Sequence, residues 1–551
     1  MNIVTKRTLL ASSTVMATVL FIPFLAAQSI ISGDITGTVT DPSAASLPNA
    51  EVTMQNTSTG ATQSTTTNTQ GVYRFALIPP GTYNVTVLAS GFRGARQTHL
   101  NVVAGQSAIA NFQLQLAAAT QTVVVTEHAA GVQTQNADTT TNYSAEQVLN
   151  MPNPGGDMTY IAQTAPGVVM NTQSGYGNFS ANGMPGTSNL FSINGQNFND
   201  PFLSLNNSGA SNLMLGFNDI AEANVITNAY SGQYGQYAGS QVTYITKSGA
   251  NQFHGDAIWM WNGRAMNADD FFSNSVGSPR PFDNFNQWAT DVGGPIWKNH
   301  TFFDVDYEGV REVLPTASTL ILAPSSQFQE ATLANLSSVG NAAEIPFYKQ
   351  LFAVYNGAPA IGSAVPATTA NGGCGDFTLL GSGVPCAVQF RTTAPNKLTE
   401  YQWSARVDHN ISDRDHAYLR LFRDNGFQPT FTSPFGSTFN DQSDQPQMSA
   451  QASENHTFNA TTVNQFNGSA LFYSAAFLPS NAAAANTALP AMVAFAGGQF
   501  TETADQPFFF PQGRRVFQYQ FIDDFSKVLG NHTLRIGFSS LHDNITDLGF
   551  G

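Results

Sequence analysis

The chain has 551 residues, of which 42% are hydrophobic and 10% are charged, and its formal net charge is −15. This acidic balance argues against a nucleic-acid-binding protein, because phosphate binding requires clustered lysine and arginine. The length predicts about two to four domains. Scarce charge combined with abundant Asn, Gln, Ser, Thr and Gly favours β-structure with uncharged polar faces.

The first 27 residues are typical of a signal peptide. Lys6 and Arg7 form a basic start, an apolar run interrupted by Ser and Thr follows, and Ala27 precedes the expected cleavage point. An uncleaved N-terminal membrane anchor remains the alternative. No later stretch approaches about 18 apolar residues, so any further membrane crossing would need β-strands. The chain is therefore expected to be exported.

Residues 28–117 contain short alternating strands separated by turn signals such as Pro79-Pro80-Gly81. This spacing predicts a small antiparallel β-sandwich. The segments "GTVTDPSAASLPNAEV" and "TNTQGVYRFALIPPGTYNVTVLASGF" resemble the carboxypeptidase regulatory-like domain. The resemblance implies a transthyretin-like sandwich of the kind linked to carbohydrate or protein binding, not a peptidase. The expected core positions are Val39, Val52, Tyr73, Phe75, Tyr83, Val85 and Val87.

A polar linker, residues 118–139, carries the β-prone run Val123-Val124-Val125. Such a run in a flexible segment can add as an extra strand to the sheet edge of a partner. The alternative is a buried strand of the sandwich or of a neighbouring domain.

Residues 140–250 predict a mixed α/β unit of ordinary domain size. "SAEQVLNMP" and "MTYIAQTAPGVVM" predict two short helices, and "FSINGQNFNDP" predicts a strand and a turn. The segment 229–248 is rich in Gly, Ser and Tyr, which let a backbone approach a polar wall closely while still hydrogen-bonding. The alternative for this segment is a glycine-rich surface hairpin.

Residues 251–551 change to long strands in which apolar and polar side chains alternate, as in Phe303, Val305 and Tyr307. The connections between them alternate long and short, which is typical of an outer-membrane barrel and not of a soluble sandwich. Membrane strands must all pair, so such a sheet must close. About nine strands are expected, near 253–262, 284–293, 301–311, 400–409, 415–424, 446–458, 462–473, 515–526 and 531–541.

The sequence gives no sign of an enzyme. None of the nine histidines stands in an H-x-x-E or H-E-x-x-H pattern, and G-x-S-x-G and P-loop motifs are missing. Asp304, Asp306 and Glu308 could suggest a metal site, but alternation explains them more simply as charges that face the lumen. We therefore expect no catalytic, cofactor or metal residues. Cys374 and Cys386 could close a small disulfide in the long connection 312–399, the best candidate for a ligand-facing element.

Taken together, the chain resembles the TonB-dependent outer-membrane transporters, specifically the Oar-like group with an N-terminal carboxypeptidase regulatory-like domain. "NDIAEANVITNAYSGQYGQYAGSQVTYITKSGANQFHGDAIW" looks like the end of the plug and the first barrel strand, and "DVGGPIWKNHTFFDVDYEGVRE" looks like an early barrel hairpin. By this resemblance, residues 140–250 are the plug and 251–551 belong to the barrel. The TonB box-like residues are Thr122, Val123, Val124, Val125 and Thr126.

The resemblance implies energised uptake across the outer membrane. An extracellular ligand (a siderophore, glycan, peptide or cobalamin) would bind, and a periplasmic TonB-type protein would pull on the plug. "GQYGQYAG" has Gln where family members often carry Glu and Arg, which weakens any claim about ion pairs there. The alternative is a surface-binding or adhesion protein without active transport.

The strand count does not match a complete barrel of this kind. Large transporter barrels have about 22 strands and single-chain bacterial barrels have even numbers, whereas about nine are expected here. The sequence therefore predicts a chain truncated at its C-terminal side.

Overall fold

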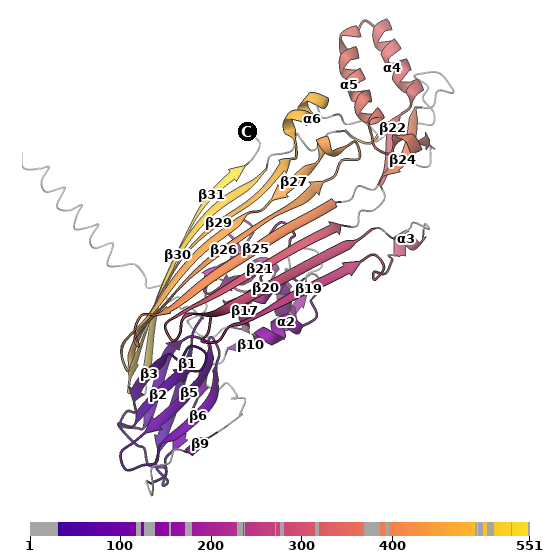
Figure 1. Ribbon diagram of the computed structural model, residues 1–551. Helices are drawn as coiled ribbons and strands as arrows, with labels where there is room; N and C mark the ends of the chain where they lie inside the picture. The colour runs from indigo at the N-terminus through magenta and orange to yellow at the C-terminus, as the bar shows by residue number, and fades with distance from the viewer. Residues whose placement is uncertain are drawn as a thin grey trace, which may run out of the picture.

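The computed structural model describes residues 31–548 with internal gaps, and the signal-peptide prediction lies outside the described residues. The fold is mainly β, as predicted. Three parts follow one another along the chain: a small sandwich, a mixed sheet and a large sheet of long strands (Figure 1). The gaps are 117–122, 126–137, 154–155, 171–178, 229–234, 236, 270, 276–279, 281, 315–318, 368–385, 393–395, 491–492, 494–499, 504–511 and 531.

The N-terminal sandwich consists of two facing sheets. One has the order β4-β1-β7, with β8 also paired to β1, and the other has the order β3-β2-β5-β6-β9. All seven predicted core positions are buried between them. The strands are β1 (Gly33–Thr40), β2 (Glu51–Asn56), β3 (Thr62–Thr66), β4 (Val72–Ile78), β5 (Gly81–Leu88), β6 (Ala95–Val102), β7 (Ser107–Ile109), β8 (Phe112–Gln113) and β9 (Val123–Val125).

The mixed sheet has the order β10-β17-β18-β13-β14 and contains one parallel pair, β13 with β18. The first predicted helix is present as α2, which begins at a capping box between Ser144 and Gln147. The second predicted helix is present as a 3₁₀ helix over Met158–Thr164, and the end of the predicted segment forms β11 instead. The elements are β10 (Thr139–Ser144), α2 (Ala145–Asn150), β11 (Val168–Met170), β12 (Phe179–Ala181), β13 (Leu190–Ile193), β14 (Gln196–Asn197), β15 (Asn199–Asp200), β16 (Leu205–Asn206), β17 (Ile220–Asn228) and β18 (Gln241–Thr246).

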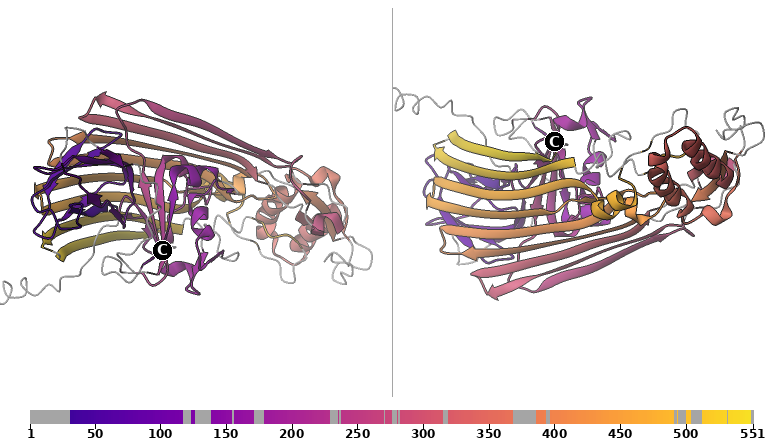
Figure 2. Two further views of the ribbon diagram at one scale, coloured as in Figure 1. Left: turned by 90° about the horizontal axis from the view of Figure 1, so that it is seen from below. Right: turned by 90° about the horizontal axis from the view of Figure 1, so that it is seen from above.

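The large sheet has ten antiparallel strands with β19 and β31 at its edges. All nine predicted strands are present, most of them longer than expected, and the short β27 is an addition. Figure 2 shows the sheet curving along one side of the mixed sheet. The strands are β19 (His254–Gly263), β20 (Asn284–Trp297), β21 (Thr301–Leu314), β25 (Asn396–Asn410), β26 (Asp415–Phe431), β27 (Asp441–Asp444), β28 (Gln447–Asn459), β29 (Thr462–Pro479), β30 (Gln512–Leu529) and β31 (His532–Leu548).

The two faces of this sheet differ in chemistry. Outward positions carry exposed apolar and aromatic side chains, among them Trp259, Phe521 and Phe538. Inward positions carry polar side chains such as Gln451 and Gln520, which are buried. An apolar outer face with a polar inner face is the pattern of a barrel wall in a membrane. Among the described residues, no helix is both long and apolar enough to cross a membrane.

The sandwich packs at the short-turn end of the sheet. Gln63 Nε2 donates to Thr457 Oγ1 (2.7 Å), Thr65 Oγ1 donates to the carbonyl of Ala460 (3.1 Å), and Asn68 Nδ2 donates to that of Gly530 (3.2 Å). The sandwich thus lies at the end of the sheet where the connections between strands are short.

At the opposite end, the connection after β21 is folded. The sequence predicted a long connection here but not its internal fold, which is a three-stranded sheet with two helices. Its elements are β22 (Thr319–Pro324), α4 (Ser326–Ser338), α5 (Ile345–Asn356), β23 (Val365–Pro366) and β24 (Ala387–Thr392). Their apolar core includes Tyr355 and Phe390, together with Phe435 and Phe500 from two other connections. This end therefore carries a small packed unit (Figure 1).

Candidate functional site

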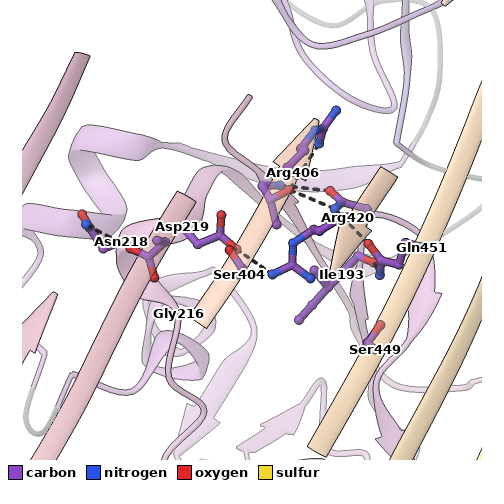
Figure 3. Close-up of polar contacts among 12 residues, drawn as sticks. Ile193, Gly216, Asn218, Asp219, Ser404, Arg406, Arg420, Ser449 and Gln451 are labelled. Carbon is purple, nitrogen blue, oxygen red and sulfur yellow. Dashed lines mark hydrogen bonds and ion pairs between the residues drawn. The ribbon is translucent and has the colours of Figure 1, made fainter. Parts of the chain in front are cut away.

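The candidate site is the seam between the mixed sheet and the inner wall of the large sheet. At its centre lies an ion pair, in which Arg420 on β26 donates to Asp219 Oδ2 at 2.6 Å. Ser404 Oγ on β25 donates to the same oxygen at 2.9 Å (Figure 3). The side chains of Arg420 and Asp219 are only 3% and 4% exposed, so the pair is shielded from solvent. Breaking such a buried pair by removing one partner is costly.

Backbone N–H groups of the mixed sheet's loops donate to carboxylates of the wall. The amide of Gly216 donates to Glu308 at 2.6 Å, and that of Ser211 donates to Glu400. Gly216 has a positive φ of 105°. A Cβ at Gly209 would lie 1.9 Å from Glu400 Oε1, so glycine is needed for this close approach.

The turn of "FSINGQNFNDP" reaches the wall beside this ion pair. Asn194 and Gly195 both have positive φ, which is the geometry of the two-residue hairpin turn favoured by Asn-Gly. Gln451 Nε2 on β28 donates to the carbonyl of Ile193 (3.0 Å) and to Gln196 Oε1 (2.6 Å). Ser449 Oγ also donates to Gln196 Oε1 at 2.6 Å. Here uncharged polar groups hold the turn to the wall.

The same segment also contacts the last strands of the large sheet. Asn197 donates through its backbone N–H to Gln520 Oε1 on β30 at 2.8 Å. Asp200 forms an ion pair with Arg514, whose Nε lies 3.1 Å from Asp200 Oδ1. The seam thus reaches across the sheet as far as β30. Apolar contacts lie among its hydrogen bonds: Phe198 packs edge-on against Phe422 of β26, and Ala289 and Leu471 of the wall join the apolar cluster of the mixed sheet.

In the Gly-, Ser- and Tyr-rich segment 229–248, the structure describes residues 235 and 237–248, and several of their contacts lie within the mixed-sheet unit. Its described part forms β18, whose Tyr244 is buried and donates to the carbonyl of Met158 at 3.1 Å, within the mixed sheet. Gly239 packs against Ser188 and Asn189, also within that unit. Thr246 at its end accepts from Arg406 at 3.2 Å. Close backbone approach to the wall is seen at Gly209 and Gly216, in other loops of the unit.

Asp304, Asp306 and Glu308 lie on inward positions of β21 and are buried, as expected for charges that face the lumen. Asn218 Nδ2 donates to Asp306 (3.3 Å), and Gln287 Nε2 donates to Glu308 (2.8 Å). This first part of the wall is rich in carboxylates.

Lys247, directly after β18, forms ion pairs with two neighbouring carboxylates of the wall. It lies 3.1 Å from Asp291 Oδ1 and 3.3 Å from Asp256 Oδ2. Burial lowers the pKa of Lys247, but Asp291 and Asp256 outweigh that effect, so the pKa is raised overall. Lys247 therefore stays charged where the mixed sheet continues into the barrel wall.

The TonB box-like run is seen as β9, at the edge of the sandwich. Val123 to Val125 pair in parallel with Ala95 to Gln97 of β6. This corresponds to the alternative of a sandwich strand, although Thr122 and Thr126 lie outside the described residues. The pairing shows that the backbone of this run can add to a sheet edge.

The sequence prediction of the loop cysteines stays a prediction. Cys386 is buried beside β24, whereas Cys374 lies outside the described residues. The packed unit between β21 and β25 lies at the end of the sheet opposite the sandwich (Figure 1).

The ion pairs of the seam, formed by Asp219, Arg420, Asp200 and Arg514, were not predicted. Arg420 lies within the predicted strand 415–424, and Arg514 lies one residue before the predicted strand 515–526. The signal was an arginine on an inward position. Charged residues on the polar face of a barrel strand need a partner from inside the lumen. The partners could not be found from the sequence, because they come from irregular loops.

Two family comparisons cover most of the chain. Residues 245–550 match the family described as outer membrane beta barrel domain, and residues 34–115 match the carboxypeptidase regulatory-like domain. The chain is 25% identical over 286 residues to the TonB-dependent transporter Oar of Myxococcus xanthus, covering 49% of this chain and 26% of that protein.

Among solved structures, the chain is similar to the outer membrane transporter YddB from Escherichia coli (TM-score 0.46, 11% identity) and to the siderophore receptor PirA from Acinetobacter baumannii (TM-score 0.45, 11% identity). Each comparison covers 74% of this chain and 48% of the other. The chain thus spans about a quarter of the length of the curated relative and about half of these two structures.

Proposed function

The chain belongs to the outer membrane beta-barrel domain family, and from that premise we propose that it acts as an Oar-like TonB-dependent receptor. It would bind an extracellular ligand and import it with energy delivered by a TonB-type periplasmic protein. The mixed sheet, residues 140–250, would be the plug, and the run around Val124 would be the segment that the periplasmic protein holds.

The observation that carries this proposal is the seam. This unit meets the wall through many hydrogen bonds and ion pairs, such as Asp219 with Arg420, alongside apolar contacts such as Phe198 with Phe422. Water and new partners can replace the polar contacts at modest net cost, because the net contribution of a hydrogen bond is only about 1 kcal/mol. A seam of this kind suits a plug that is held in place at rest and shifted when it is pulled.

β9 gives the proposal a direct test. Strand addition uses backbone hydrogen bonds, and proline has no N–H to donate. We expect the purified full chain to bind the periplasmic domain of the host's TonB-type protein in isothermal titration calorimetry. Val124→Pro should abolish that binding, whereas the matched control Ala130→Pro, in the same linker, should retain it.

The outcomes separate the proposal from its rival. If Val124→Pro binds as well as the wild type, the run around Val124 is not the segment that the periplasmic protein holds. If the wild-type chain does not bind the periplasmic domain at all, the surface-binding alternative without active transport is favoured. Tighter binding by Val124→Pro would mean that release from β6, not pairing, controls the interaction.

A further inference from the structure

His254, Asp291 and Asp304 meet on the inner face of the first three strands of the large sheet. His254 on β19 is paired with Gly293 on β20, which is in turn paired with Asp304 on β21. Asp291 is two residues before Gly293 and therefore points to the same face. The three side chains offer ligand atoms that all lie within 4.8 Å of one another.

Gly293 leaves the space in which these side chains converge. A Cβ at this position would lie 2.5 Å from Asp304 Oδ2 and 2.6 Å from His254 Nε2. Any other residue would push both groups away. The glycine therefore forms the floor of a small cradle bounded by an imidazole and a carboxylate.

The two carboxylates are short of hydrogen-bond donors, and Asp304 Oδ2 has only His254 Nε2 beside it, at 3.5 Å. Asp291 and Asp304 are 1% and 2% exposed, and Oδ2 of each accepts no hydrogen bond. Lys247 binds only the other oxygen of Asp291, at 3.1 Å. A buried carboxylate oxygen without a donor is costly, so this arrangement calls for a cation.

His254 has the orientation of a metal ligand. Its Nδ1 lies 3.2 Å from the carbonyl of Gln252, which can only accept, so Nδ1 carries the proton. In the neutral ring the lone pair of Nε2 then faces Asp304 Oδ2 at 3.5 Å. Two acceptors facing each other repel, whereas a cation between them would be bound by both. A backbone carbonyl behind the ring is the usual support of a metal-bound histidine.

We propose that His254, Asp291 and Asp304 bind one divalent transition-metal ion, with Zn²⁺ as the best match. Two ligands of one Zn²⁺ lie about 3–4 Å apart, which the separation of His254 Nε2 and Asp304 Oδ2 satisfies. One imidazole with two carboxylates favours Zn²⁺ over Ca²⁺, which prefers six or more oxygens. The ion would neutralise both carboxylates and link β19, β20 and β21 beside Lys247. This revises the expectation from sequence that the carboxylates of β21 are simply lumen-facing charges.

The test is calorimetric titration of Zn²⁺ into the full chain in detergent after treatment with a chelator. We expect about one strongly bound Zn²⁺ per chain, with affinity reduced at least about tenfold in Asp304→Asn and His254→Ala. Gly293→Ala removes no ligand but fills the cradle, so it should weaken binding to a similar extent. Retention of the wild-type affinity in Asp304→Asn would overturn the proposal.

A second cluster supplies the matched control. Asp415, Glu454 and His456 also lie within reach of one ion, but His456 Nδ1 already contacts Asp415 Oδ1 at 2.5 Å and all three side chains are 29–40% exposed. His456→Ala should therefore leave the strong Zn²⁺ site intact. Loss of strong Zn²⁺ binding in His456→Ala would show that the ion binds at this second cluster, and would overturn the proposal.

Two measurements on the wild-type chain do not depend on the folding of variants. X-ray absorption at the zinc edge should show a shell of one imidazole nitrogen with oxygens, and an all-oxygen shell would contradict the assignment. Excess Ca²⁺ should not displace Zn²⁺, and equal affinity for Ca²⁺ would also contradict it.

Discussion

The N-terminal sandwich and the seam under the mixed sheet are both closely packed, but the seam adds buried ion pairs and polar turns to its apolar contacts. The sandwich encloses a continuous apolar core in which Phe75 and Val85 are almost fully buried. The seam places Asp219 against Arg420 and polar turns against glutamines. An apolar core resists separation as a unit, whereas a polar seam can exchange its partners. We therefore expect the sandwich to stay folded under conditions in which the seam between the mixed sheet and the wall separates.

The largest expected effect lies in the sandwich core. Phe75→Ala removes a side chain that is 3% exposed and should cost about 3–5 kcal/mol. We expect the sandwich to become sensitive to limited proteolysis while the large sheet stays resistant. Thr53→Ala, on the outer face of β2, serves as the control. Unchanged resistance in Phe75→Ala would show that the core does not hold the sandwich together.

The next effect concerns the ion pair of the seam. Arg420→Ala leaves Asp219 buried without its cation and should destabilise the seam by about 3 kcal/mol. Hydrogen exchange should then rise in β17 and β18 but not in the sandwich. Arg423→Ala, on an exposed position of the same strand, should have no such effect. Equal hydrogen exchange in both variants would show that the ion pair does not stabilise the seam.

A pH-dependent contact joins the two units. Glu222 on β17 accepts from the backbone N–H of Ala104 in the sandwich at 3.1 Å, and burial raises the pKa of Glu222 to about 7. A raised carboxyl pKa means that the folded state holds the proton more tightly, so stability is greatest below the ordinary value and falls as pH rises through about 7. The loss should be of the order of 2–3 kcal/mol.

Unfolding followed in urea between pH 5 and pH 8 measures this effect. The wild-type chain should lose stability across this range, and Glu222→Gln should largely abolish the dependence. A wild-type chain that becomes more stable with rising pH would reverse the sign and contradict the assignment.

The smallest expected effect on stability comes from the N-cap of α2, the helix that follows β10 in the mixed-sheet unit. Ser144 caps α2 by accepting from the backbone N–H of Gln147, and Ser144→Ala should cost about 1 kcal/mol. Ser144→Thr keeps a hydroxyl and should restore most of it. Ser144→Ala should lower the urea midpoint of unfolding slightly. Equal midpoints for the Ala and Thr variants would show that the cap contributes nothing to stability.

Periodicity explains why the strands were predictable and the seam was not. Phe303, Val305 and Tyr307 reveal their strand because alternation is a local property of the sequence. The 3₁₀ helix at Met158–Thr164 was read as an ordinary helix, because short helical patterns do not distinguish the two. The connection after β21 was read as a loop, although its core is completed by residues more than 100 positions away, such as Phe500. Partners such as Asp219 and Arg420 depend on the tertiary fold.

The most direct test of the account is hydrogen exchange of the full chain in detergent across a urea series. Amides of β17 and β18 in the mixed sheet should become exchangeable at a lower urea concentration than those of β28 and β29 in the large sheet or of β2 and β5 in the sandwich. That result would show that the polar seam parts while both neighbours stay folded. Exchange of all these strands in one transition would contradict a separable plug.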